Sequence, residues 1–254
     1  MKSMQKIKSF LKRYPRFYNF IKSRYYDLRF NLKENILGTK VQKEKWATKH
    51  IHEGDEWIKQ YWNLINHSHR QFLMNRLSKL YPFDSILEVG SNCGPNLFLL
   101  AKKYPHATIK GIDINPLAVQ RGSEWFAKED ISNVKLLVGE ASNLGQFKDK
   151  SFDIVFTDAV LIYVGKDEIR NVIKEMIRVA RSYLVLVEWH YFNSRNKDPY
   201  GLGVHHYSLW KRDYKALLKQ FVPEDNIHIT KIPDDLWPEE EWKEFGVIIE
   251  VKLD

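Results

Sequence analysis

The chain has 254 residues, of which 44% are hydrophobic, and this is enough for one α/β domain with an appended segment. Its single cysteine, Cys93, excludes an internal disulfide and is typical of a reducing compartment. The sequence has no run of roughly 18 apolar residues and no apolar signal region, so we expect a cytoplasmic protein without a membrane span.

Positive charge is concentrated in the first 50 residues, which hold 14 Lys or Arg against 3 Asp or Glu, while the remainder holds 26 against 29. Within residues 1–35, basic side chains are interleaved with aromatic ones at helical spacing. This pattern suits peripheral contact with an anionic inner membrane surface, and equally a helix that folds back onto the core. Nucleic acid is a less favoured partner for the same segment.

Residues 43–66 are predicted to be helical and include four large aromatic side chains, Trp46, Trp57, Tyr61 and Trp62. Trp57, Tyr61 and Leu64 share one helical face, which favours packing in the core. A further helix over 70–80 precedes the first predicted strand. We therefore expect a helical extension over residues 1–66 and a second domain over residues 67–254.

The second domain alternates strand-like and helix-like runs. The predicted strands are 86–90, 108–113, 134–138, 152–157, 182–189, 226–232 and 245–253, and the predicted helices are 95–104, 116–128, 166–180 and 208–220. This alternation is typical of a Rossmann-like α/β three-layer sandwich with a seven-stranded, mostly parallel sheet. No helix is evident between the last two strands, so the final strand is expected to be antiparallel.

A glycine-bounded loop follows the first predicted strand, from Gly90 to Gly94, directly after Glu88. Asp113 ends the next strand 23 residues after Gly90, a spacing that places a carboxylate to bind ribose hydroxyls. Asn92 stands where a dinucleotide fingerprint has its second glycine, and the sequence contains no triphosphate-binding loop. A ribose-bearing cofactor without a pyrophosphate is therefore favoured.

Between about residues 70 and 190 the chain resembles the class I S-adenosylmethionine-dependent methyltransferases. The resemblance rests on four motifs in the order that this family shows: Glu88-x-Gly90-x-x-x-Gly94, Gly111-Ile112-Asp113-Ile114-Asn115-Pro116, Gly139-Glu140-Ala141 and Phe152-Asp153-Ile154-Val155-Phe156-Thr157-Asp158. It implies S-adenosylmethionine as the cofactor and a methyltransferase domain over residues 67–254. Asn92 for the usual middle glycine and Glu140 for the commoner aspartate depart from the family pattern.

The resemblance also implies which residues contact the cofactor. Glycines of the loop would flank the methionine part, and Glu88 would face its amino group. Asp113 would bind the ribose hydroxyls, Ile114 would pack on the adenine, and Glu140 and Ala141 would lie at the adenine edge. The whole predicted cofactor site comprises Glu88, Gly90, Ser91, Asn92, Gly94, Asp113, Ile114, Glu140, Ala141 and Asp158.

Methyl transfer to a hydroxyl group needs the acceptor atom held about 3 Å from the methyl carbon and a general base. We expect that base near the carboxyl ends of the fourth and fifth strands, with His206 as first choice, followed by His205 and His190. Asp158, Tyr163 and Glu188 are further candidates there. The polar loop 191–204 is expected to act as a lid. No Cys-x-x-Cys or His-Glu-x-x-His spacing occurs, so no metal site is predicted.

Two features of the sequence bear on the identity of the methyl acceptor. The Asn/Asp-Pro-Pro-Tyr/Phe motif typical of amine and amide methylation is missing after Phe156. Residues 88–97 and 206–214 resemble methyltransferases of bacterial surface-sugar biosynthesis, such as the pseudaminic-acid-associated methylases. This implies a saccharide or sugar-nucleotide acceptor, whose phosphate or carboxylate would meet Arg195, Lys197, Lys211 and Arg212. An RNA methyltransferase, a non-catalytic cofactor-binding module and, more remotely, a dinucleotide oxidoreductase are the alternatives.

Overall fold

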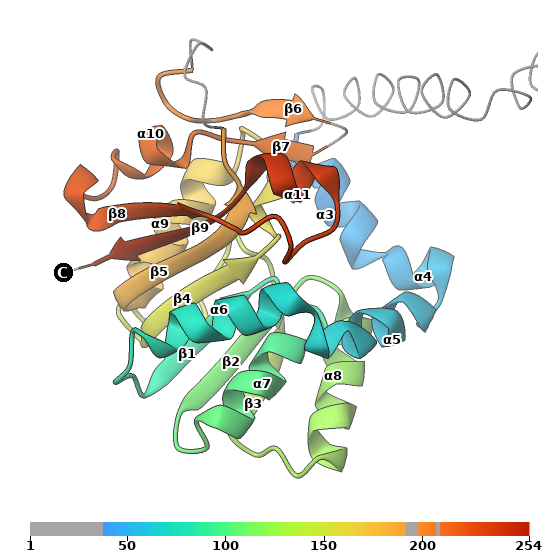
Figure 1. Ribbon diagram of the computed structural model, residues 1–254. Helices are drawn as coiled ribbons and strands as arrows, with labels where there is room; N and C mark the ends of the chain where they lie inside the picture. The colour runs from blue at the N-terminus through green and yellow to red at the C-terminus, as the bar shows by residue number, and fades with distance from the viewer. Residues whose placement is uncertain (1–37, 192–197, 207–208, 254) are drawn as a thin grey trace, which may run out of the picture.

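The computed structural model describes residues 38–191, 198–206 and 209–253. Its centre is a seven-stranded sheet in the order β3-β2-β1-β4-β5-β9-β8 (Figure 1). The strands are β1 (Ser85–Val89), β2 (Thr108–Asp113), β3 (Val134–Val138), β4 (Phe152–Asp158), β5 (Ala180–Trp189), β8 (Ile227–Lys231) and β9 (Gly246–Lys252). Strands β1 to β5 pair in parallel, and β9 is antiparallel to both β5 and β8. The predicted fold class, including the antiparallel last strand, is confirmed.

Helices cover both faces of the sheet, because its inner strands are apolar on both sides. They are α6 (Ser68–Ser78), α7 (Pro95–Lys103), α8 (Pro116–Lys128), α9 (Ile169–Val179), α10 (Tyr214–Leu218) and α11 (Glu240–Phe245). One hydrophobic cluster packs α9 and α10 against one face, and another packs α6, α7, α8 and α11 against the other. Successive strand residues alternate between the two clusters, as Ile86 and Leu87 do.

The connection between β5 and β8 does not contain one helix over residues 208–220, as was predicted. Two short strands, β6 (Val204–His206) and β7 (Leu209–Lys211), pair antiparallel before α10. The cross-strand pair of His205 and Trp210, with ring centroids 4.1 Å apart, supports the pairing. Asp213 accepts a hydrogen bond from the Ala216 N–H at 3.0 Å and so starts α10 later than predicted. Helix α11 also occupies the connection between β8 and β9, where no helix was expected.

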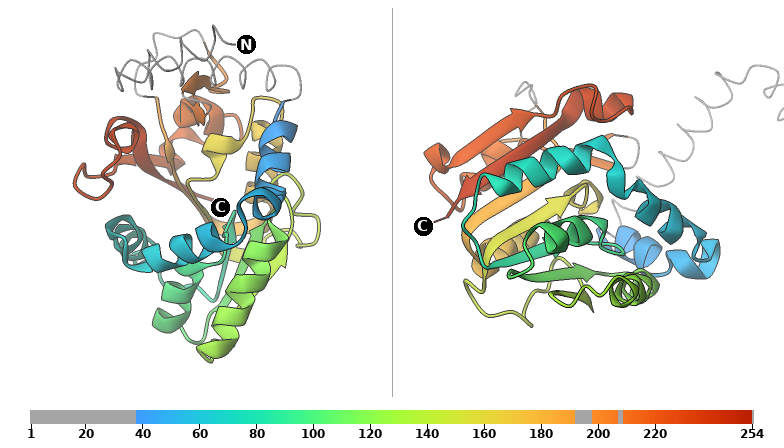
Figure 2. Two further views of the ribbon diagram at one scale, coloured as in Figure 1. Left: turned by 90° about the vertical axis from the view of Figure 1, so that its right-hand side faces the viewer. Right: turned by 60° about the horizontal axis from the view of Figure 1, so that its bottom comes forward.

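Three short helices precede the sheet domain in place of one helical run over 43–66: α3 (Lys40–Ala47), α4 (Lys49–Glu53) and α5 (Glu56–Asn63), followed by the 3-10 turn η1 (Leu64–Asn66). Gly54, at φ 69°, ends α4. These helices lie along the edge at which the parallel strands end (Figures 1 and 2). Leu64 is 50% exposed, so its predicted place in the core is wrong.

Several predictions fall outside the described residues, namely those on the arm 1–35 and on Arg195 and Lys197 of the expected lid. No helix in the described part of the chain is long and apolar enough to cross a membrane.

Arg212 joins the β6–β7 hairpin to the segment that follows β4. Its side chain is fully buried, and it donates to the carbonyl oxygens of Leu202 at 3.0 Å and Leu161 at 2.7 Å, and to that of Val164. A buried guanidinium is tolerated where such acceptors surround it. Arg212 is therefore a structural residue, and the expectation that it meets a phosphate is wrong.

Replacing Arg212 with Met should lower the free energy of unfolding by about 3 kcal/mol, because three buried carbonyl groups lose a charged donor. Urea denaturation measures the change. Arg121→Met is the matched control, since Arg121 makes surface ion pairs and its loss should leave the unfolding midpoint unchanged. Equal midpoints for both variants and the natural protein would contradict the structural role of Arg212.

Candidate functional site

A cavity of ≈ 210 Å³ lies at the carboxyl ends of β1, β2 and β4, beneath α3 and α5. Open α/β sheets place ligands at this edge, where neighbouring strands diverge. Seven residues of the predicted cofactor site line the cavity: Gly90, Asn92, Asp113, Ile114, Glu140, Ala141 and Asp158. The structure thus brings together residues that lie as far as 68 positions apart in the sequence.

The loop after β1 reaches the cavity through left-handed backbone conformations. Gly90 has φ 78°, and a Cβ there would come within 2.4 Å of Val160. Asn92 has φ 51°, and its side-chain oxygen accepts a hydrogen bond from the next backbone N–H at 2.8 Å, which helps a non-glycine residue to adopt this conformation. Glu88, Ser91 and Gly94 are not among the residues that line the cavity; Glu88 and Ser91 are buried, and Gly94 packs against Phe126 of α8.

Asp113 ties this loop to the end of β2. Its Oδ2 accepts from the Asn92 N–H at 2.7 Å and its Oδ1 from the Asn115 N–H at 2.8 Å. Burial raises the pKa of Asp113, and the two backbone donors oppose that rise. Each carboxylate oxygen keeps a further acceptor position for a donor in the cavity.

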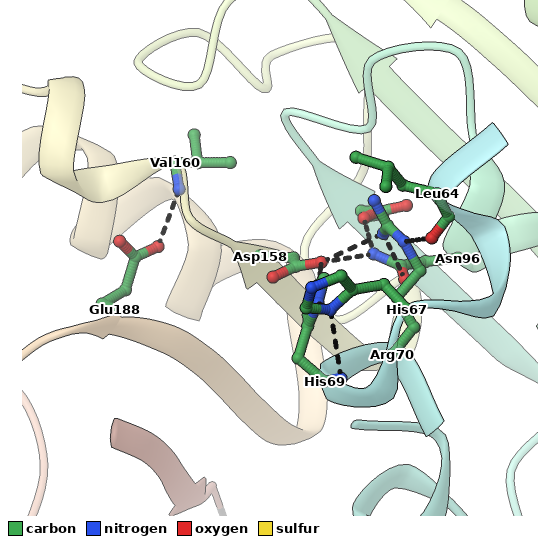
Figure 3. A network of polar contacts seen from close by, with 9 residues as sticks. Leu64, His67, His69, Arg70, Asn96, Asp158, Val160 and Glu188 are labelled. Atoms are coloured by element: carbon green, nitrogen blue, oxygen red, sulfur yellow. Dashed lines mark hydrogen bonds and ion pairs between the residues drawn. The ribbon is translucent and has the colours of Figure 1, made fainter. Parts of the chain in front are cut away.

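A buried polar cluster lies behind the glycine loop and connects β1, β4, α6 and α7 (Figure 3). Asp158 Oδ2 accepts from three donors: His69 Nε2 at 3.1 Å, Arg70 Nη1 at 3.2 Å and Asn96 Nδ2 at 3.0 Å. Asn96 also donates to Glu88 Oε1 at 2.7 Å. Although burial opposes the charge, His69 and Arg70 hold the pKa of Asp158 well below its usual range.

Two oxygens of this cluster have no hydrogen-bond partner within the described structure, Asp158 Oδ1 and Glu88 Oε2, and both are buried. Burial raises the pKa of Glu88 well above its ordinary value. A buried acceptor without a donor is costly, and such atoms commonly mark the place of a ligand group. A bound molecule that brings an ammonium and a hydroxyl group would satisfy them.

Helix α3 crosses the cavity opposite the glycine loop and is held at two points. The backbone N–H of Thr39 donates to both carboxylate oxygens of Asp167, at 3.1 and 3.0 Å, and its hydroxyl group donates to Oδ1 at 2.7 Å. Lys43 Nζ lies 2.7 Å from both Glu140 Oε2 and Glu168 Oε2. Trp46 of α3 packs edge-on against Tyr163, with ring centroids 5.0 Å apart. These contacts hold α3 along one side of the cavity.

The three histidines predicted to supply the general base do not line this cavity. His190 accepts a hydrogen bond from the Tyr214 N–H at 3.2 Å at the start of α10. His205 packs on Trp210, and His206 packs on Trp189 and Phe245. The prediction rested on their position after β5, but the hairpin and α10 direct them into packing contacts.

The other candidate bases divide into two kinds. Tyr163 lines the cavity, and burial raises its pKa to about 12. Glu188 is fully buried and accepts hydrogen bonds from Thr157 Oγ1 and from the backbone N–H groups of Val160, Leu161 and Ile162. Burial raises the pKa of Glu188 to about 7. Glu188 shapes the segment after β4 rather than facing the cavity.

Sequence reasoning missed Thr39, Lys43, His69, Arg70 and Asn96. A usable signal existed for Arg70, which precedes Leu73 and Leu77 on the buried face of α6. A charged side chain on such a face needs a buried partner of opposite charge. Nothing local identifies that partner as Asp158, because the two residues are 88 positions apart.

Comparisons with known proteins agree with this geometry. Residues 86–182 match a family model described as a methyltransferase domain. The arsenite methyltransferase of Halobacterium salinarum is 31% identical over 81 residues, which are 32% of this chain and 20% of that enzyme. The chain therefore spans about a fifth of the length of this relative.

Solved structures share the fold. An S-adenosylmethionine-dependent methyltransferase from Aquifex aeolicus superposes with a TM-score of 0.54 at 15% identity, covering 79% of this chain and 98% of that one. The geranyl diphosphate C-methyltransferase from Streptomyces coelicolor A3(2), solved with Mg²⁺, geranyl diphosphate and S-adenosyl-L-homocysteine, gives a TM-score of 0.56 at 12% identity, covering 79% of this chain and 84% of that one.

The family match covers the glycine loop, Asp113, the turn at Glu140 and the end of β4, which line the cavity on the side of the sheet, whereas α3 and α5 lie outside the match. The sheet order and the antiparallel β9 match the fold that the resemblance implied. Residues 86–182 therefore match a methyltransferase domain, and the chain has the fold of S-adenosylmethionine-dependent methyltransferases.

Proposed function

We propose that the protein transfers the methyl group of S-adenosylmethionine to a hydroxyl group of a saccharide or another small polar acceptor. The observation that carries this proposal is Asp158 Oδ1, a buried acceptor atom on a residue that lines the cavity, for which the described residues supply no hydrogen-bond donor. A hydroxyl group donates one hydrogen bond and can be oriented by such an oxygen. The bound cofactor supplies the activated methyl group, and the protein supplies position and exclusion of water.

The residues present fit the cofactor at several points. Asp113 keeps acceptor positions for the two ribose hydroxyls, and the apolar side chains of Ile114 and Ala141 offer a surface for the adenine. Gly90 lets the backbone approach the methionine part closely. Glu88 Oε2 is the buried acceptor that we assign to the cofactor's ammonium group.

The acceptor side of the cavity favours an uncharged molecule. Among the described lining residues Lys43 alone is basic, and it is already paired with Glu140 and Glu168. Lys211 lies over the ring of Phe245 at 4.0 Å, outside the cavity lining. No described basic residue is therefore placed to hold a phosphate in the cavity. A neutral hydroxyl of a saccharide, the class implied by residues 88–97, fits this lining.

Within residues 38–191, 198–206 and 209–253, no group of three or more His, Cys, Asp or Glu side chains is arranged to hold a metal ion. The chemistry of this proposal rests on the residues named above.

Asp113→Ala tests the ribose contact. The natural protein should bind S-adenosylhomocysteine with a binding free energy on the order of −8 kcal/mol, and the variant should bind at least about tenfold more weakly. Isothermal calorimetry measures both. Asp234→Ala is the control, since Asp234 lies in the loop after β8 and pairs with Lys231 at the surface. Unchanged affinity in Asp113→Ala would refute the ribose contact.

Proton release tests the role of Glu88. Its raised pKa means that the free protein holds a proton there at a pH where an ordinary glutamate is ionised. An ammonium group favours the ionised form, so cofactor binding should release a proton and strengthen as the pH rises through that pKa. Calorimetry near pH 6 in buffers of different ionisation enthalpy detects the release. Glu88→Gln should abolish it, and equal heats in all buffers for the natural protein would contradict the assignment.

Transfer of a labelled methyl group tests the activity itself. A panel of saccharides, nucleotide sugars, small amines and RNA, offered with labelled cofactor, should yield label in a neutral saccharide or other polyol. Asp158→Asn should lower that rate by about 100-fold while S-adenosylhomocysteine affinity changes little. Label in RNA, lost on removing residues 1–35, would instead favour the RNA alternative. Cofactor binding without transfer to any acceptor would favour the non-catalytic module.

A further inference from the structure

One side of the cavity is lined by aromatic rings, and none of the cofactor contacts assigned above uses them. Trp46 of α3, Trp57 and Tyr61 of α5, and Tyr163 after β4 all line the cavity, and we call these four residues the aromatic wall. Trp57 and Tyr61 are four positions apart and therefore share one face of α5. All four side chains are half-buried, so part of each ring is left uncovered by protein atoms.

The rings of the aromatic wall are held by contacts with one another. The ring centroid of Trp46 lies 5.0 Å from that of Tyr163, at an interplanar angle of 71°, and 6.2 Å from that of Trp57, at an angle of 65°. Lys49 Nζ lies 4.6 Å from the ring centroids of both Trp46 and Trp57. Edge-to-face contacts between rings and a cation shared by two rings stabilise this arrangement. The aromatic wall is therefore formed by the protein itself, without a ligand.

The aromatic wall lies on the side of the cavity where Asp158 lies. The guanidinium group of Arg70, which pairs with Asp158, lies over the ring of Tyr61 at 4.9 Å. Tyr163 follows Asp158 by five positions, in the segment after β4. The adenine is expected elsewhere, beside Ile114 at the end of β2. The aromatic wall therefore borders the space left for the methyl acceptor.

Trp46 also presents a hydrogen-bond donor that is not used within the described part of the chain. Its Nε1 atom is buried and has no hydrogen-bond partner among the described residues. Its backbone carbonyl accepts from Asn115 Nδ2 at 2.7 Å, so the residue is anchored beside the end of β2 while its ring reaches Tyr163. A buried indole N–H group usually has an acceptor, and an unpaired one commonly marks the place of a ligand oxygen. A ligand that fits the aromatic wall therefore brings both an apolar surface and an acceptor oxygen.

A pyranose ring has both properties. The C–H bonds on its face form an apolar patch, and its hydroxyl and ring oxygens accept hydrogen bonds at its rim. The ring is puckered and its C–H bonds point in several directions, so it can contact aromatic rings that stand at an angle to one another. A flat aromatic acceptor stacks on rings parallel to it, and neither the Trp46–Tyr163 pair nor the Trp46–Trp57 pair is parallel.

We propose that the aromatic wall is the acceptor subsite, in which Trp46 and Trp57 contact the C–H face of a pyranose ring and Trp46 Nε1 donates to one of its oxygens. This inference rests on the proposed function, because it states how a saccharide acceptor is held. The aromatic wall supplies binding and selects a ring among hydroxyl compounds, and Asp158 Oδ1 orients the hydroxyl group that reacts.

Binding to the subsite can be measured without turnover. The indole N–H resonances of the ¹⁵N-tryptophan-labelled protein, saturated with S-adenosylhomocysteine, are followed by NMR while the methyl glycosides of glucose, galactose and mannose are added in turn. Trp46→Phe identifies the Trp46 resonance, which at least one glycoside should shift. Glycerol has hydroxyl groups but no ring face and should leave that resonance in place. A Trp46 resonance that moves with S-adenosylhomocysteine but with none of the glycosides would overturn the proposal.

Kinetics with the same glycosides test the contribution of the ring and of its N–H group. Trp46→Leu should raise the glycoside KM by at least about tenfold and change kcat less, since the aromatic wall holds the acceptor equally before and during transfer. Trp46→Phe keeps a ring but loses the donor, so its KM should rise by about fivefold. S-adenosylhomocysteine affinity should stay unchanged in both variants. Tyr81→Leu is the matched control, because Tyr81 is 63% exposed and outside the cavity lining.

The two measurements separate this inference from the proposed function. Trp46→Leu should also lose the preference for a glycoside over glycerol, which a merely structural role of Trp46 would leave intact. Methyl transfer to a glycoside with the natural KM in Trp46→Leu would refute the aromatic subsite and leave the proposed function standing. A glycoside that shifts the Trp46 resonance but receives no methyl group would support the subsite and contradict the proposed function instead.

Discussion

The buried ion pair between Arg70 and Asp158 is the contact on which the arrangement of the site depends. Both side chains are 2% exposed, and taking each charge out of water costs several kcal/mol. That cost is offset only while Arg70 also reaches Asn96 Oδ1 at 2.7 Å and the Leu64 carbonyl at 3.1 Å. The end of β4, the start of α7 and the turn before α6 are therefore fixed together.

The same ion pair helps to decide which carboxylate oxygen of Asp158 is left for a ligand. Three donors occupy Asp158 Oδ2, so Oδ1 is left for the cavity. The same cluster engages Glu88 Oε1 through Asn96 and leaves Oε2. Two carboxylates with unequal pKa shifts, lowered at Asp158 and raised at Glu88, can then serve different ligand groups.

Helix α3 sets a second constraint, because it lies across the cavity that the cofactor must enter. Lys43 holds Glu140 and Glu168 through partly exposed ion pairs, which contribute little stability and can open at low cost. Glu140 is also the residue expected at the adenine edge. Under the proposed placement of the cofactor, the adenine and Lys43 would share the Glu140 carboxylate, and the position of α3 would be linked to occupancy of the site.

The sequence predicted the sheet and seven of the residues that line the cavity, because the signals for them are local. Within the predicted strand 182–189, residues 183–187 form a continuous apolar run, and Asp113 follows Gly90 at the spacing expected of a ribose-binding carboxylate. The cluster at Asp158 depends instead on contacts between α6 and β4, which no local pattern contains. The three histidines after β5 were chosen by position alone. His205 and His206 lie in the β6–β7 hairpin and His190 contacts the start of α10, and none of the three lines the cavity.

The most direct test of this account is a crystal structure of the protein with S-adenosylhomocysteine bound. We expect the ribose hydroxyls on Asp113, the ammonium group on Glu88 Oε2, and Asp158 Oδ1 without a contact to the cofactor. A cofactor lodged outside this cavity, or an ammonium group bound to Asp158 Oδ1, would contradict the account.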